Sequence, residues 1–139
     1  MTDLFIEDKI HDECGVFGIF GNDTTDIIDE TYLALYALQH RGTLGAGIAI
    51  NDNGNMNVVK GFGVVPEALP EKELSRLKKA KIALGHVRHT TASVANDRTS
   101  IQPLLMRYVN GQLSLALNGA LTNYSELREY LHRGGAIFQ

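Results

Sequence analysis

The only cysteine of the chain, Cys14, stands at the head of a short apolar run that is rich in glycine. Residues 15–20 read Gly-Val-Phe-Gly-Ile-Phe, which is typical of a buried strand where glycine admits another backbone or a ligand. This position, behind a polar leader at residues 1–13, suggests a cysteine that becomes residue one of a mature chain. A free α-amine beside its own thiol supplies a base and a nucleophile together. The simpler alternative is a small buried hydrophobic side chain.

Composition excludes several classes of protein. At 139 residues the chain is one domain or part of one, and 44% hydrophobic residues suffice for a core. The net charge of −3 gives no electrostatic reason to bind nucleic acid. The leader lacks the apolar core of a secretory signal, and no run approaches the roughly 20 apolar residues of a membrane span. One cysteine excludes an internal disulfide and a cysteine metal cluster. We therefore expect a cytoplasmic protein without a metal site in this chain.

Hydrophobic periodicity predicts a strand-rich α+β chain. Strands are expected over residues 16–20, 45–50, 56–60, 82–88, 103–108 and 112–117, and helices over residues 26–39, over 70–77 and from 123 onward. Asp26 is the expected N-cap of the first helix, and Gly42 is placed to end it. Asn123 is the expected cap of the last helix, with Glu126 as its capping-box partner.

Some of these strands are apolar on both faces, as Val16 beside Phe17 and Ile82 beside Ala83 show. Sheets that are buried on both sides need covering layers, so we expect two stacked sheets flanked by helices. Residues 136–138 read as the opening of a further strand, which predicts a domain that is truncated at its C-terminus.

Two stretches place polar residues beside predicted strands. In the first, His40-Arg41-Gly42 ends a helix, and a tight turn explains the glycine without explaining the basic pair. In the second, His86 and Arg88 share one face at the end of a strand. Arg88 could hold a carboxylate with its bidentate fork, and Thr91 could add a donor. A surface strand with a salt bridge, and a structural role for His86, are the alternatives.

A third stretch ends a strand at Asn118-Gly119. An amide side chain and a backbone N–H that point to one place are the parts of an oxyanion hole. An ordinary Asn-Gly turn is the alternative.

Four motifs occur in a specific order: Cys-Gly-Val-Phe-Gly-Ile-Phe-Gly, His-Arg-Gly-x-x-Gly-Ala-Gly-Ile, Gly-His-Val-Arg-x-x-Thr-Ala and Asn-Gly-x-Leu-x-Asn. Together they resemble the class II glutamine amidotransferase domain, and within that class they are most similar to the amidophosphoribosyltransferase family. The resemblance covers about residues 12–139. It implies an N-terminal-nucleophile hydrolase fold, an αββα sandwich. It also implies a propeptide at residues 1–13 and the N-terminal part of a glutaminase domain at residues 14–139.

The resemblance also implies roles for single residues. Cys14 attacks the side-chain amide of glutamine and forms a thioester, while its α-amine takes and returns the proton. Asn118 and the Gly119 N–H hold the oxyanion. The implied substrate-binding residues are Arg88, Thr91, Arg41, Gly42 and His86. Arg88 binds the α-carboxylate, Thr91 lies beside it, and Arg41 and Gly42 shape the wall around the nucleophile.

In this family, ammonia passes to a phosphoribosyltransferase domain and makes phosphoribosylamine for purine biosynthesis. The expected partners are therefore glutamine, that further domain, and other copies in a homo-oligomer, with neither nucleic acid nor membrane. Magnesium, and in some members an iron–sulfur cluster, is expected with the further domain and not in this chain. We also expect the 139-residue chain alone to be inactive or weak.

Departures from the family pattern occur at Thr43-Leu44, His89, Leu117 and Ala120. They leave open another class II amidotransferase or a non-catalytic module that binds glutamine or a partner. A further alternative is a cysteine–histidine hydrolase with His40 or His86 as its base.

Overall fold

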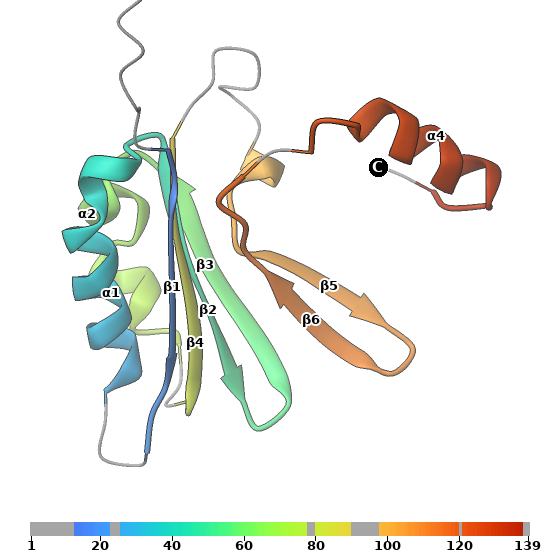
Figure 1. The fold of residues 1–139 in the computed structure, drawn as a ribbon. Coiled ribbons are helices and arrows are strands. Elements are labelled where there is room, and N and C mark those ends of the chain that lie inside the picture. The colour runs from blue at the N-terminus through green and yellow to red at the C-terminus, as the bar shows by residue number, and fades with distance from the viewer. Residues whose placement is uncertain (1–12, 23–25, 78–79, 90–97, 120, 138–139) are drawn as a thin grey trace, which may run out of the picture.

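The main sheet is formed by four antiparallel strands in the order β1-β4-β2-β3 (Figure 1). The structure is a computed structural model that describes residues 13–22, 26–77, 80–89, 98–119 and 121–137. The strand bounds are β1 Gly15–Phe20, β2 Gly45–Asp52, β3 Asn55–Phe62 and β4 Ile82–Arg88. Gly15 pairs with Val87, and Gly45 pairs with Arg88. The starts of β1 and β2 therefore lie beside the C-terminal end of β4, at the same end of the sheet.

Helices cover one face of this sheet (Figure 1). Their bounds are α1 Ile27–Ala37, the 3₁₀ turn η1 Gln39–Arg41, α2 Val65–Ala68 and α3 Glu71–Leu74. The Asp26 side chain accepts the N–H groups of Ile28 and Asp29, both at 3.3 Å, which confirms it as the N-cap of α1. No helix in the described ranges is long and apolar enough to cross a membrane.

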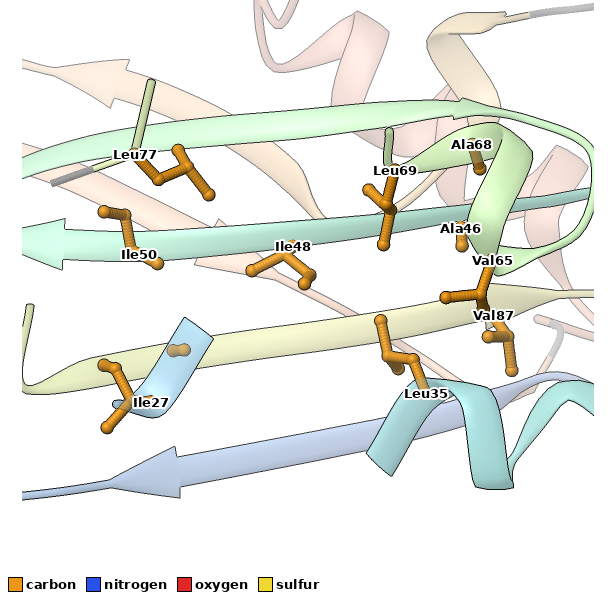
Figure 2. Close-up of a cluster of buried hydrophobic side chains, with 11 residues drawn as sticks. Ile27, Leu35, Ala46, Ile48, Ile50, Val65, Ala68, Leu69, Leu77 and Val87 are labelled. Carbon is orange, nitrogen blue, oxygen red and sulfur yellow. The ribbon is translucent and has the colours of Figure 1, made fainter. Parts of the chain in front are cut away.

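The hydrophobic core lies between the sheet and these helices (Figure 2). Ile48 and Ile50 of β2 and Val87 of β4 point into it and meet Leu35 and Val65 from the helical layer. All five side chains are at most 2% exposed. Burial of each is worth about 1.5–3 kcal/mol, so this layer supplies much of the stability of the chain.

A narrow stripe of α1 is buried. Ile27, Thr31 and Leu35 are fully buried, whereas Ile28 and Tyr32 are only partly buried at its margin. Thr31 can be buried because its hydroxyl donates to the Ile27 carbonyl oxygen at 2.5 Å.

A two-stranded hairpin lies across the main sheet from α1 (Figure 1). It consists of β5 Leu104–Tyr108 and β6 Gly111–Leu115, and the 3₁₀ turn η2 Arg98–Ser100 precedes it. The Gln112 side chain accepts the Met56 N–H at 2.6 Å and so ties β6 to the start of β3. The last helix, α4 Tyr124–Arg133, stands beyond the hairpin with its side chains exposed (Figure 1).

The strand predictions are mostly confirmed, and β4 matches its predicted bounds of 82–88. The predicted burial of both faces is wrong at Val16 and Ile82, which lie on the same face of the main sheet as His86 and are 40% and 46% exposed. Residues 136–137 form no strand, contrary to the expectation for residues 136–138, and residue 138 lies outside the described ranges.

Two predictions about the helices are wrong, and α2 was not predicted. The helix expected over 70–77 is only the single turn of α3. Asn123 is the N-cap residue of α4, as predicted, but its side chain makes no capping bond there. Gly42 is not the C-terminal cap of α1, which ends at Ala37. It follows η1 instead, and its φ of −170° is extended and not left-handed.

Candidate active site

Cys14 lies immediately before β1, as a half-buried free thiol. Its Sγ accepts the backbone N–H of His89 at 3.4 Å. Its carbonyl oxygen accepts Nε–H of Arg41 at 2.8 Å. The backbone φ of Cys14 is 41°, a conformation that residues other than glycine seldom adopt. The cysteine is therefore held from two sides in an unusual conformation, which is common for residues at functional sites.

The strand register explains how Cys14 meets residues far along the chain. Gly15 pairs with Val87 in an antiparallel ladder, so the residue before Gly15 lies beside the residues that follow Val87. These are Arg88 at the end of β4 and His89 after it. The start of one buried strand and the end of another thus form one site.

Arg41 and Gly42 form a wall next to this site. Arg41 ends η1, and its Nη2 also lies 3.3 Å from the Glu13 carbonyl oxygen. A Cβ atom on Gly42 would lie 2.4 Å from the Arg88 carbonyl carbon, so only glycine lets this turn pack against the end of β4. The structure therefore brings Arg41 against Cys14 and Gly42 against Arg88 and His89, while their part in glutamine binding stays a prediction.

Arg88 is half-buried, and its guanidinium donates to the Ser100 hydroxyl of η2. Its carbonyl oxygen accepts the Leu44 N–H at 3.0 Å, which fixes the backbone between β4 and β2. A fork of N–H donors on a fixed strand end, beside a thiol, suits a substrate carboxylate. Thr91, which we expected next to it, lies outside the described residues.

His86 lies two residues before Arg88 and is completely buried, with 0% exposure. The pKa of His86 is lowered to about 4, mainly because the ring is buried; the Leu117 backbone opposes this shift, and the nearby Arg88 charge adds a smaller lowering effect. Neither ring nitrogen makes a hydrogen bond of ordinary geometry within the described residues. His86 is therefore a neutral, buried side chain, and the ring does not offer the exposed surface that substrate binding needs.

His40 also lies apart from the thiol. Its Nδ1 is 3.0 Å from the Ala37 carbonyl oxygen on the helix end, and the ring is exposed. In the described part of the chain neither His40 nor His86 bonds with Cys14. The cysteine–histidine alternative therefore has no geometric support here.

Asn118 and Gly119 follow β6 and are exposed. The residue before them, Leu117, donates its N–H to the Gln102 side chain at 2.6 Å. The Gln102 backbone packs on Gly47 of β2, which pairs with His86 of β4, so the turn lies on the Arg88 side of the main sheet. Asn118 makes no hydrogen bond with Cys14 among the described residues. Its aim toward the thiol remains a prediction.

Three residues of the site were not predicted. His89 acts through its backbone N–H, which no side-chain pattern reveals. Ser100 and Gln102 precede the strand expected over residues 103–108, and no role was predicted for either side chain.

A further cavity lies away from Cys14, within the helical layer. A cavity of about 530 Å³ between α1, α2 and α3 is lined by Asp29, Tyr32 and Glu71 on the far side of the sheet from Arg88. No three His, Cys, Asp or Glu side chains gather to hold a metal ion in the ranges that the structure describes.

Comparison with known proteins identifies the chain. It is 44% identical over 131 residues to the amidophosphoribosyltransferase of Bacillus subtilis (strain 168), an alignment that covers 94% of this chain. It is 38% identical over 138 residues to amidophosphoribosyltransferase 3, chloroplastic, of Arabidopsis thaliana, which covers 99% of this chain. The chain is a homologue of the amidophosphoribosyltransferases. It spans only 27% and 25% of the length of these two relatives. No family model matches it.

Solved structures agree with the sequence comparisons. A structure described as the allosteric regulatory enzyme of purine biosynthesis superposes with a TM-score of 0.79 at 44% identity, over 89% of this chain and 26% of that one. The B. subtilis glutamine phosphoribosylpyrophosphate amidotransferase, complexed with ADP and GMP, gives 0.76 at 42% identity, with the same coverage. These matches to amidophosphoribosyltransferase confirm the predicted α+β, N-terminal-nucleophile hydrolase fold.

Proposed function

We propose that the chain is the glutaminase part of an amidophosphoribosyltransferase and releases ammonia from glutamine. The observation that carries the proposal is the place of Cys14 at the head of β1, with Sγ against the His89 N–H and next to Arg88. The homology to amidophosphoribosyltransferases supports it.

The chemistry starts at the thiol. After removal of residues 1–13, the Cys14 α-amine, with an ordinary pKa of about 7.7–8.0, takes the thiol proton, and Sγ attacks the amide carbon of glutamine. The His89 N–H donates to the sulfur and helps to hold it at the start of β1. The carbon–nitrogen bond breaks, the amine returns its proton to the leaving nitrogen, and ammonia leaves. Water then hydrolyses the thioester to glutamate.

Two further groups have different tasks in this proposal. Arg88 holds the substrate α-carboxylate, which places the amide carbon near Sγ. Asn118 and the Gly119 N–H donate to the oxygen that becomes negative in the tetrahedral intermediate. Thr91 completes the carboxylate site.

The proposal also covers the full-length protein. Its ammonia would pass to a phosphoribosyltransferase domain and make phosphoribosylamine, in a cytoplasmic homo-oligomer. In this proposal the expected magnesium or iron–sulfur group belongs with that domain. No step of the proposed glutamine hydrolysis uses such a group.

The test is glutamate release from glutamine by the intact protein, with its N-terminus determined by sequencing. We expect hydrolysis when Cys14 is the first residue, and none from Cys14→Ala or from protein that retains the leader. Hydrolysis at an equal rate with the leader in place would refute the role of the α-amine. No hydrolysis by correctly processed protein would refute the glutaminase function.

A further inference from the structure

Gln102 connects the expected oxyanion turn to the main sheet. Its side-chain Oε1 accepts the Leu117 N–H at 2.6 Å, one residue before Asn118. The ladder of β6 ends at Leu115, so this bond lies beyond the paired part of the strand. The place of the turn therefore depends on Gln102 and not on sheet hydrogen bonds.

Gln102 itself has a fixed place on β2. A Cβ atom on Gly47 would lie 2.4 Å from the Gln102 carbonyl oxygen and 2.9 Å from Cδ of Pro103, so this backbone rests directly on the strand. The preceding residue, Ile101, is 0% exposed and its carbonyl oxygen accepts Nζ–H of Lys60 at 2.5 Å. The Gln102 amide thus extends from a firmly packed segment.

The same segment also reaches Arg88. Ser100, two residues before Gln102, accepts the Arg88 guanidinium. One short stretch, residues 100–102, therefore contacts both the proposed carboxylate-binding residue and the backbone that leads to the proposed oxyanion donors. The two halves of the site are held in relation to one another through it.

We propose that Gln102 is a positioning residue for glutamine hydrolysis, which sets the place of Asn118 and Gly119 through the Leu117 N–H. The inference rests on the proposed glutaminase function. Oxyanion donors act only when they stay within about 0.5 Å of their productive place. Without the Gln102 acceptor, the Leu117 N–H would form a hydrogen bond with water, and the Asn118-Gly119 turn would shift. Gln102 touches neither the substrate nor the reacting atoms in this proposal.

Gln102→Met tests the proposal, since methionine has a similar volume and no oxygen acceptor. Gln112→Met is the matched control, because Gln112 accepts the Met56 N–H in a bond that is also 2.6 Å long but lies where β3 begins, at the far end of the sheet. Gln102→Asn, which keeps the amide but is one methylene too short, serves if the methionine variant does not fold. Each variant of the intact, processed protein is assayed for kcat and KM with glutamine.

We expect Gln102→Met to lower kcat about 10- to 100-fold, the cost of a donor misplaced by about 1 Å, while KM stays within about twofold. Amide hydrogen exchange at residues 117–119 should become about tenfold faster in that variant and not in Gln112→Met. A purely structural role would affect KM and the melting temperature together.

The outcomes separate the two proposals. If the wild type hydrolyses glutamine and Gln102→Met keeps the same kcat or the same amide exchange at residues 117–119, the role of Gln102 is refuted while the glutaminase function stands. If the processed wild type does not hydrolyse glutamine, the proposed function is refuted, and the role of Gln102 in that reaction with it.

Discussion

The backbone N–H of His89 points to the Sγ atom of Cys14 at 3.4 Å, across 75 residues of sequence. The contact exists because β1 and β4 are antiparallel neighbours, so that the start of one meets the end of the other. It places a hydrogen-bond donor on the proposed nucleophile. It also leaves Arg88, the residue before His89, within the same small region.

Cys14→Ser should reduce glutamine hydrolysis by several orders of magnitude, because a hydroxyl is a far weaker nucleophile than a thiol at neutral pH. The measurement is glutamate release by the intact, processed protein. A chloroketone analogue of glutamine should alkylate Cys14 in that protein. Equal alkylation of protein that retains its leader would contradict the proposed use of the α-amine.

Arg88→Lys should raise KM for glutamine about tenfold or more with little change in kcat, because lysine lacks the fork that binds both carboxylate oxygens. Arg76→Lys is the control, since Arg76 forms an exposed ion pair with Glu73 on the helical face. Steady-state kinetics on both variants decide the matter. A fall in kcat at constant KM would show that Arg88 acts in the transition state instead.

Asn118→Ala should lower kcat by roughly 10²–10³ with little change in KM, the usual cost of one lost oxyanion donor. Asn55→Ala, at the exposed start of β3, is the matched control and should behave as the wild type. An unchanged kcat would mean that the turn after β6 does not reach the reacting carbonyl.

His86 should make the protein less stable in mild acid. Its folded-state pKa of about 4 is below the unfolded value of 6.5, so the unfolded state binds the proton more readily. The stabilisation is complete above pH 6.5 and is lost as the pH falls toward 4. Between pH 7.5 and pH 5 this group alone should lower the free energy of unfolding by about 2 kcal/mol.

Denaturant unfolding at the two pH values measures that loss. His86→Gln should remove most of the difference, whereas His132→Gln, on the exposed face of α4, should leave it as in the wild type. The same loss in His86→Gln as in the wild type would show that other groups cause the acid sensitivity.

Local patterns predicted the elements that local physics controls. β4 was predicted to the residue, since an apolar run with polar residues at both ends has one natural place in a buried sheet. The Asp26 cap was predicted because its bonds reach only two and three residues along the chain. Asn123 was also placed correctly at the start of α4, but the capping bond expected of its side chain is absent there, so residue type alone did not decide that bond.

The pairings within the site needed the tertiary structure. Ser100 lies 12 residues from Arg88, and Gln102 lies 15 residues from Leu117, so neither contact follows from helix or strand periodicity. The full burial of His86 likewise depends on the segment that crosses β2 and not on β4 alone.

The sequence by itself determined the family and the α+β fold, because residue types in a fixed order carry that information without coordinates; it also predicted Cys14 as the nucleophile. Only the tertiary structure decided that His86 is buried and neutral, that a backbone N–H meets the sulfur, and that residues 100–102 join Arg88 to the turn at Asn118. The physical reason is that strand register and close backbone packing are properties of the whole folded chain. They bring together pairs of residues that are separated by 15 positions in one case and 75 in another.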